Sequence, residues 1–453
     1  MPNASNTLCA VERVEQAIQR IEARNPLLNA FTHVTLERAR REAADIDRRR
    51  QQGETLGPLA GVPFAVKNLF DIQGVTTVAG SIVHRHAPPA QDDAVLVARL
   101  KAAGAVLMGA LNMDEYAYGF TTENSHYGPT RNPHDVTCVA GGSSGGSGAA
   151  VAAGMVPLTL GSDTNGSIRV PSSLCGVWGL KPTFGRLSRR GTFPFVNSLD
   201  HLGPMADSVN LLAAAYDAMQ GPDAQDPGCH ATRVQPTAQQ IGLGSQGLRI
   251  GVLSGYFQDM ASEAARASVH KAATALGATA EVTWPDAAYA RAAAFIVTAS
   301  EGGALHLEDL RRCAEDFERL SVDRFLAGAL QPAAWYVRAQ RFRSVYRDKV
   351  QALFKNWDIL LAPATPVCAQ PIGTEWLDIQ GQKLPCRAAM GLLTQPISFA
   401  GCPVVTAPVW PSGLNGMPVG VQLIAAPWRE DLALRAAHTL ESMGVAQLKA
   451  YTA

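Results

Sequence analysis

The sequence has few charged residues and no net charge. Asp, Glu, Lys and Arg make up 17% of the 453 residues, below the roughly 25% of an average soluble protein. The 39 basic side chains are balanced by 39 acidic ones, so the composition gives no basic footprint for nucleic acid. We therefore expect no direct nucleic-acid partner.

Long hydrophobic runs are also missing. A membrane-spanning helix needs about 18 or more consecutive apolar residues, and the apolar stretch 149–160 is broken by Gly154 and Pro157. Residues 1–12 do not show the basic segment followed by an apolar segment that is typical of a secretory signal. The sequence thus predicts neither a secretory signal nor a membrane partner.

The 8 cysteines are scattered, without a CxxC pair and without metal-type spacing beside histidines. Secreted disulfide frameworks and zinc sites both need closer, regular cysteine spacing. We expect reduced thiols, a cytoplasmic location and no metal site.

Strand-like and helix-like segments alternate along the chain. Apolar residues at helical spacing predict a helix over 11–25 that is stopped by Pro26. An alternating pattern predicts a strand over 59–66, directly before Lys67, and a helix over 93–103 precedes an apolar strand at 105–108. This alternation is typical of an α/β fold with a layered sheet.

Domain boundaries are weakly marked. Pro, Gly, Asp and Gln gather at 221–245, which is consistent with either a linker or a long surface loop. No internal repeat is visible. We expect one domain over 1–453, with a helical subregion at about 280–345.

A Gly/Ser tract at 141–148 is followed by small residues at 149–153 and an apolar run at 155–160. An isolated tract of this kind is often a flexible linker, but a linker would not be placed between core segments. Nucleotide-binding loops are excluded because the tract lacks Gly-Lys-Ser/Thr and the third fingerprint glycine. A nucleophile elbow centred on Ser144 fits the letters GxSxG, yet the preceding residues 135–140 form a weak strand pattern.

A second cluster of small and turn-forming residues lies at 161–169. Such residues bring several backbone N–H groups around the Ser167 hydroxyl, which suits a nucleophile beside an oxyanion site. A tight turn capped by Asp163 or Asn165 is the structural alternative. Lys67 is the candidate base, since burial at the end of an apolar strand lowers the pKa of a lysine; a surface lysine beyond a strand end is the other interpretation.

Together these segments resemble the amidase signature family. The resemblance rests on Lys67 after an apolar strand, GGSSGGS at 141–147, GSDTNGSIR at 161–169 and CGVWGLKP at 175–182, with Ser167 following Ser143 by 24 positions. It implies one large mixed sheet with helices on both faces.

The resemblance also implies a Ser–Ser–Lys triad. Ser167 would attack an amide carbonyl, and Ser143, which follows a cis peptide in this family, would pass the proton to neutral Lys67. The backbone of Thr164, Asn165 and Gly166 would form the oxyanion hole around an acyl-enzyme. Neither a metal nor an organic cofactor is implied.

The substrate is suggested by departures from one branch of the family. Residues 113–116, 122–125 and 128–133 resemble the A subunits of glutamyl-tRNA amidotransferases, which release ammonia from glutamine. Those subunits have an acidic residue before the LLTxP stretch, where this chain has Gly391, and a glycine where this chain has Asn165. Arg343 matches the arginine that would bind a substrate carboxylate.

A site with a carboxylate-binding arginine and no partner for an ammonium group suits a small carboxylated amide. The pattern resembles the carboxybiuret hydrolases of cyanuric acid degradation, with Arg343 and Asn165 as substrate contacts. Other small-amide hydrolases and the glutaminase-type A chain of an amidotransferase remain alternatives, as does a non-catalytic protein that keeps the fold. Arg343 could equally belong to a solvated helix face with Arg341 and Arg347.

Both branches work with a small helical partner. The resemblance therefore implies a partner resembling the C chain of the amidotransferases, and an oligomer.

Overall fold

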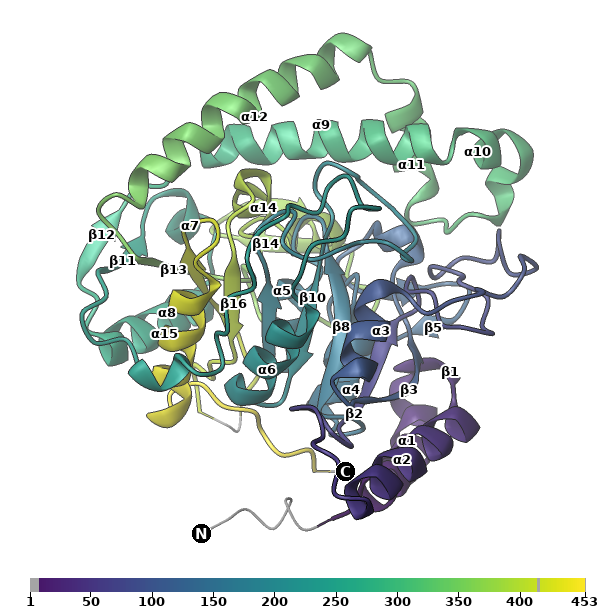
Figure 1. Ribbon diagram of the computed structural model, residues 1–453. Helices are drawn as coiled ribbons and strands as arrows, with labels where there is room; N and C mark the ends of the chain where they lie inside the picture. Colours follow the sequence, from purple (N-terminus) through teal and green to yellow (C-terminus); the bar gives the residue numbers. More distant parts are fainter. Residues whose placement is uncertain (1–7, 414–415, 453) are drawn as a thin grey trace.

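An 11-stranded mixed sheet runs through the computed structural model, which describes residues 8–413 and 416–452 (Figure 1). The sequence analysis found no signal pattern in residues 1–12, and residues 1–7 of that segment lie outside the described ranges. From edge to edge the strands are β1 (Phe31–Val34), β3 (Val106–Leu111), β2 (Pro63–Lys67), β8 (Leu158–Asp163), β10 (His201–Ala206), β9 (Trp178–Lys181), β16 (Val404–Ala407), β17 (Val421–Ala425), β13 (Ile359–Pro363), β11 (Ile250–Leu253) and β12 (Ala280–Val282).

Parallel pairing occurs in two groups of strands. β2 is parallel to β3 and β8, and β11 is parallel to β12 and β13. The pairs from β8 through β10, β9, β16 and β17 to β13 are antiparallel, and β1 is antiparallel to β3. The mixed α/β sheet expected from the family resemblance is confirmed.

Helices cover both faces of the sheet because successive side chains of a strand point to opposite faces. Phe64 and Val66 of β2 belong to one hydrophobic cluster, whereas Ala65 belongs to the other. The first cluster includes α3 (Val95–Ala102), α6 (Val209–Met219), α8 (Glu263–Leu276) and α15 (Glu430–Ser442). The second includes α1 (Ala10–Leu28), α2 (Leu36–Gln51) and α4 (Gly145–Ala152).

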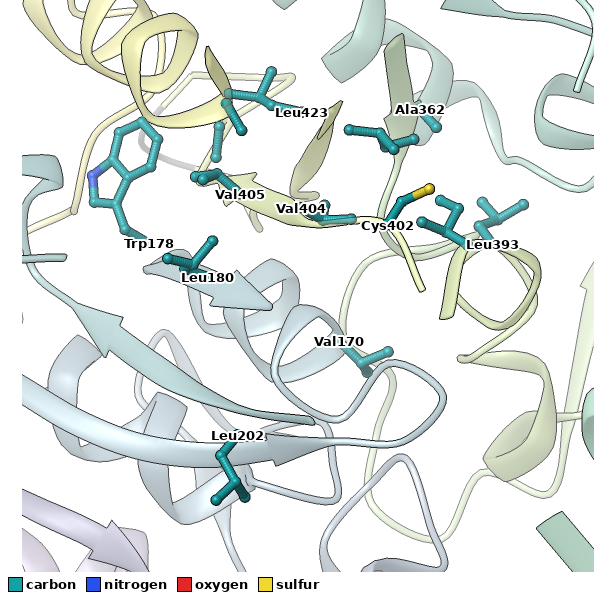
Figure 2. Packing of buried hydrophobic residues seen from close by; sticks show 14 of the residues in the cluster. Val170, Trp178, Leu180, Leu202, Ala362, Leu393, Cys402, Val404, Val405 and Leu423 are labelled. Atoms are coloured by element: carbon teal, nitrogen blue, oxygen red, sulfur yellow. The ribbon is translucent and has the colours of Figure 1, made fainter. Parts of the chain in front are cut away.

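The middle of the sheet is fully buried. Figure 2 shows Trp178 and Leu180 of β9 near Val404 and Val405 of β16, with Leu423 of β17 beyond them. These side chains are shielded from solvent on both faces. Burial on both faces explains why these strands are mostly apolar and do not alternate between apolar and polar residues.

Four helices extend across one end of the sheet (Figure 1). They are α9 (Ala287–Leu305), α10 (Leu307–Cys313), α11 (Val322–Ala329) and α12 (Ala333–Leu353). α9 contacts α11, α12 and the short helix α14 (Gln395–Ala400). These helices lie beyond the ends of β2 and β8, where the polar motifs of the sequence are found.

The remaining elements are short. They are the helices α5 (Arg169–Cys175), α7 (Tyr256–Asp259) and α13 (Cys386–Ala389), and the ribbons β4 (Glu123–Asn124) with β5 (Gly128–Pro129), β6 (Arg131–Asn132) with β7 (Asp135–Val139), and β14 (Trp376–Ile379) with β15 (Gln382–Pro385). Over the described ranges, no helix combines the length and apolar character that crossing a membrane requires.

The sequence predicted that the first helix stops at Pro26, and this prediction is wrong. It continues to Leu28, and Asn29 then adopts a left-handed conformation and donates its N–H to the Asn25 carbonyl. The Asn25 side chain also accepts hydrogen bonds from the N–H groups of Ala30 and Phe31. A proline in the last turn removes one helical hydrogen bond, and these contacts stabilise the chain end around it.

The segment 221–245 is a loop that is fixed to its surroundings. Asp226 forms an ion pair with Arg189 at 3.0 Å. Farther along, the N–H of Thr237 donates to the Asp217 carboxylate. These contacts hold the segment against the body of the protein.

Candidate active site

Lys67 ends β2 and is completely buried. Its Nζ donates to Ser143 Oγ at 2.6 Å and to Ser162 Oγ at 2.9 Å. Burial lowers the pKa of this lysine from 10.5 to about 7, against the opposing influence of Asp114, Asp200 and Asp163. The amine can therefore be neutral near pH 7, as the sequence predicted for a base in an apolar setting.

Ser143 is held in place by the close packing of the Gly/Ser tract. The Gly142–Ser143 peptide bond is cis, and the Ser143 carbonyl accepts a hydrogen bond from the N–H of Asp114 at 3.2 Å. A Cβ on Gly142 would lie 2.1 Å from Asp114 Oδ2, and a Cβ on Gly146 would lie 2.6 Å from the Asn112 nitrogen. The glycines are thus required by neighbouring groups, which rules out a flexible linker.

Ser144 has a structural role in the folded chain. Its hydroxyl donates to the Ser162 carbonyl at 3.2 Å and accepts from the Ser162 N–H at 3.3 Å. The side chain is fully buried, and both hydrogen bonds fix the end of β8 against the start of α4. This arrangement does not fit a nucleophile elbow centred on Ser144.

Ser167 lies in the loop that joins β8 to α5. It is 2% exposed and lines a small cavity. Ser162, near the end of β8, accepts a hydrogen bond from Lys67, and Asp163 Oδ2 accepts from the N–H groups of Ile168 and Arg169 at the end of the loop. Ser167 and Ser162, which contacts Lys67 directly, therefore lie in the same short segment of the chain.

The predicted oxyanion segment is fixed by its side chains and by close contacts. Thr164 Oγ1 donates to Asp200 at 2.6 Å, and Thr394 Oγ1 donates to the Asn165 carbonyl at 2.6 Å. Gly166 has a φ of +142°, and a Cβ there would lie 2.2 Å from Thr394 Oγ1. Only glycine fits at this position, so the loop backbone is pre-organised.

Asn165 points its side chain toward the helices above the sheet. Its Nδ2 donates to Thr298 Oγ1 of α9 at 2.8 Å. The residue is 5% exposed, and its Oδ1 has no hydrogen-bond partner among the described residues. A buried acceptor without a partner is costly unless a ligand supplies the donor.

The cavity beside Ser167 is small and largely aromatic. Its volume is about 20 Å³, about the space that one ordered water molecule needs. Four aromatic side chains line it together with Thr164, Asn165, Thr298, Arg324 and Gln395; the aromatic residues are Tyr118, Phe120, Phe195 and Phe295. The Ser167 hydroxyl therefore faces a nearly filled, largely apolar space.

A phenyl ring occupies the space next to Gly391. A Cβ on Gly391 would lie 2.4 Å from Phe120 Cζ, and Phe120 itself lines the cavity. An acidic side chain at position 391, which the family resemblance led us to consider, would therefore collide with this ring. The Phe120 ring thus occupies the space that a side chain at position 391 would need.

Arg343 lies outside the cavity lining. It is 7% exposed, and its Nε donates to the Phe399 carbonyl at 2.9 Å. Burial lowers its pKa from 12.5 to about 10. The interpretation that Arg343 belongs to a solvated helix face is therefore wrong, although Arg341 and Arg347 are exposed. Substrate contact by Arg343 stays a prediction.

The sequence interpretation missed Ser162, Thr298, Arg324 and Thr394. Ser162 follows an apolar strand and precedes Ser167 by five positions, which is a usable local signal. The others belong to α9, α11 and the segment before α14, and their place near Ser167 depends on tertiary contacts. Among the described residues, no group of three or more His, Cys, Asp or Glu side chains is placed to hold a metal ion.

Comparisons with known proteins identify the family of this chain. The Amidase family model matches residues 12–434. AtzE of Pseudomonas sp. (strain ADP), a 1-carboxybiuret hydrolase subunit, is 68% identical over 446 residues, with 98% of each chain covered. The A subunit of the Glutamyl-tRNA(Gln) amidotransferase of Chloroflexus aurantiacus is 40% identical over 464 residues, covering 95% of this chain and 93% of that one.

A solved structure with 68% identity superposes with a TM-score of 0.97 and covers 98% of both chains. It is described as a vestigial protein complex that reveals the evolutionary origins of an s-triazine catabolic enzyme. Since the family match spans most of the chain and the relatives cover it almost completely, the chain belongs to the amidase family and is an amidohydrolase.

Proposed function

We propose that the chain hydrolyses a small carboxylated amide such as 1-carboxybiuret, releasing ammonia through a Ser–Ser–Lys triad and an acyl-enzyme. The observation that carries the mechanism is the contact of 2.6 Å between the buried Lys67 Nζ and Ser143 Oγ. A neutral amine at that distance can accept a proton from the hydroxyl.

In the proposed acylation step, Ser167 Oγ bonds to the amide carbon. The Ser167 proton passes to Ser143 as the Ser143 proton passes to Lys67, and the carbonyl oxygen becomes negatively charged. The carbonyl then re-forms as the C–N bond breaks, and the nitrogen takes the proton back from Lys67 through Ser143 and leaves as ammonia, so that Lys67 is neutral again. Water adds to the acyl carbon in the second step, which releases the acid product and restores the Ser167 hydroxyl.

The backbone N–H groups of Thr164, Asn165 and Gly166 are proposed to bind the oxyanion. The support is the rigidity of this loop, which Thr394 and Asp200 hold from opposite sides. Each well-placed donor in such a site contributes about 3 to 4 kcal/mol to transition-state stabilisation. Asn165 Oδ1, which lacks a partner among the described residues, is proposed to accept an N–H of the substrate.

The choice of substrate is supported by the cavity and by the relatives. Glutamine carries an ammonium group that needs an acidic partner, and none of the described residues that line the cavity is acidic. Phe120 excludes such a side chain from position 391. The 68% identical relative is named a 1-carboxybiuret hydrolase subunit. These observations favour a carboxylated urea-type amide over glutamine and hence over an amidotransferase glutaminase.

We also propose that the enzyme is oligomeric and has a small helical partner resembling the C chain of the amidotransferases. The support is that the 68% identical solved relative is described as part of a protein complex.

The first test separates the two candidate serines. Ser167→Ala should lower kcat by about 10³-fold or more and should abolish labelling by a serine-reactive fluorophosphonate. Ser144→Ala should retain labelling, because it removes only the two hydrogen bonds to the Ser162 backbone. Labelling is measured by mass spectrometry. Activity is measured as ammonia release from 1-carboxybiuret, biuret, malonamate and glutamine.

A labelled Ser167→Ala variant together with an unlabelled Ser144→Ala variant would refute the proposed nucleophile. Preferential release of ammonia from glutamine would refute the proposed substrate and favour the amidotransferase alternative.

A further inference from the structure

Gln395 presents an amide N–H donor to the cavity beside Ser167. The side chain lines this cavity and is 1% exposed. Its Oε1 accepts a hydrogen bond from Arg291 Nε of α9 at 3.2 Å. Because a guanidinium can only donate hydrogen bonds, this contact keeps the amide oxygen on the side of Arg291 and turns Nε2 away from it. Nε2 has no acceptor among the described residues and is not sealed off by neighbouring atoms.

Arg291 is a half-buried cation whose hydrogen-bond acceptor is this amide. Over residues 8–413 and 416–452 it forms no ion pair, and burial lowers its pKa. Its guanidinium carbon lies 5.2 Å from the ring centroid of Phe295, which also lines the cavity. A positive charge at the oxygen end of an amide polarises the group and strengthens its N–H as a donor. Arg291 therefore orients Gln395 and directs its donor toward a ligand.

A polar acceptor borders the same cavity. Asn165 Oδ1 lacks a partner among the described residues. Thr394 connects the two amides, because its Oγ1 donates to the Asn165 carbonyl at 2.6 Å and its backbone continues into Gln395. The space of about 20 Å³ holds one water, so a larger ligand enters only as the lining side chains shift. One donor beside one acceptor matches an acylated urea, in which a carbonyl oxygen lies next to an N–H.

We propose that Gln395 donates a hydrogen bond to the second carbonyl of the substrate, the one that does not react, and so selects acylated ureas over simple ureas. This inference rests on the proposed function, because it places the reacting carbonyl at Ser167. In 1-carboxybiuret a single N–H joins the two carbonyl groups, so that N–H faces Asn165 while the second oxygen faces Gln395. An analogue without this oxygen leaves a buried donor unpaired, which weakens its binding.

The first test compares Gln395→Met and Gln395→Glu with Gln351→Met, which removes an exposed glutamine of α12. In Gln395→Met we expect the KM values for 1-carboxybiuret and for biuret each to rise about 20-fold, since both carry the second carbonyl, and kcat to change far less. Gln395→Glu should lose at least as much, because it keeps the size and the contact to Arg291 but replaces the donor with an acceptor. A side chain that only packs would tolerate Gln395→Glu.

Arg291 is tested as a positioning residue. Arg291→Met releases the Gln395 amide, so the KM for biuret should rise about fivefold with little change in kcat. Arg291→Lys keeps a donor for Oε1 and should restore most of the affinity. Equal losses in the two variants, or a loss confined to kcat, would contradict the positioning role.

A second measurement does not depend on turnover. Biuret should slow fluorophosphonate labelling of Ser167 in the wild-type protein and in Gln351→Met, each relative to its own rate without biuret. Isopropylurea has the same shape but lacks the second carbonyl, and it should slow labelling far less. This preference for biuret should disappear in Gln395→Met.

Unchanged KM values in Gln395→Met, a rise confined to 1-carboxybiuret, or equal effects of biuret and isopropylurea on labelling of the wild-type protein would overturn the assignment. Absence of any protection by biuret would also count against it. If the wild-type protein releases no ammonia from 1-carboxybiuret while protection by biuret requires Gln395, the proposed substrate fails and the role of Gln395 is supported. Hydrolysis of 1-carboxybiuret that is unaffected in Gln395→Met would support the proposed function and refute this inference.

Discussion

At the scale of single residues, two lysines of this protein share the same electrostatic perturbation but not the same chemistry. Lys67 and Lys181 are both fully buried, and burial lowers the pKa of each from 10.5 to about 7. Lys67 contacts two hydroxyl groups, whereas Lys181 Nζ donates to the Pro182 carbonyl at 2.9 Å. A lowered pKa marks a candidate base, and the neighbouring group decides whether there is a proton to accept.

The protonation of Lys67 predicts how activity depends on pH. The neutral amine is the active form, so kcat/KM should rise with pH and level off above the pKa of about 7. The neutral fraction at pH 6 implies a rate about tenfold below that at pH 8. Stopped assays of ammonia release over pH 5.5–9 would measure this profile.

Fluorophosphonate labelling of Ser167 provides the control for that profile, since it reports the nucleophile without the substrate carboxylate. Labelling should follow the same pH dependence. A rate that is flat from pH 5.5 to 8, or one that falls as pH rises, would contradict a neutral lysine as the base.

At the scale of elements, the site depends on segments that approach each other without room for side chains. Gly391, which precedes α14, packs against Phe120, which follows the turn at Glu115–Ala117. Gly391→Ala would place a methyl group 2.4 Å from the phenyl ring. We expect a loss of about 1 to 3 kcal/mol in the free energy of unfolding, measured by urea denaturation.

Gly242→Ala is the matched control, because no atom lies within 4 Å of a Cβ built there. It should leave the urea midpoint close to that of the wild-type protein. If Gly391→Ala were as stable as this control, Phe120 would have room to move, and the exclusion of an acidic residue from position 391 would be wrong.

Some elements of the fold can be predicted from the sequence more accurately than others, for physical reasons. The helix at 93–103 and the strand at 105–108 were predicted closely, because helix caps and continuous apolar runs are local signals. β10 was missed because it contains Gly203 and Pro204, which are unfavourable in strands. A Cβ on Gly203 would lie 2.1 Å from the Leu180 carbonyl oxygen, so tertiary packing selects this glycine.

The same distinction holds for the candidate site. Lys67, Ser143 and Ser167 lie in short motifs that can be recognised from neighbouring residues. Arg324 and Thr298 come from helices that are far away in sequence, within an ordinary amphipathic pattern. Their position at the cavity follows from the packing of α9 and α11 over the sheet, which no local pattern specifies.

At the scale of the whole molecule, the buried amine makes stability depend on pH. In the unfolded chain Lys67 stays protonated up to about pH 10.4, whereas in the folded protein it loses its proton near pH 7. Between these values the unfolded state binds more protons, so the contribution of Lys67 makes the folded state more stable as pH rises. Below pH 7 both states are protonated, and the effect is constant.

Comparison with Lys67→Met isolates this contribution, because other titrating groups are common to both proteins. From pH 7 to pH 9 the stability of the wild-type protein should increase by about 2 kcal/mol relative to the variant. Guanidinium chloride unfolding at the two pH values measures the difference. A constant difference, or one that favours the variant at pH 9, would mean that Lys67 keeps an ordinary pKa in the folded protein.

The helices beyond the ends of β2 and β8 have a consequence for how such an enzyme can diversify. The groups proposed to break the bond come from residues 67–167, while one part of the cavity wall comes from α9, α11 and the start of α14. Part of the choice of ligand is therefore encoded separately from the reactive groups. Substitutions confined to these helices can redirect the enzyme to a new nitrogen compound while its reactive machinery is passed on intact.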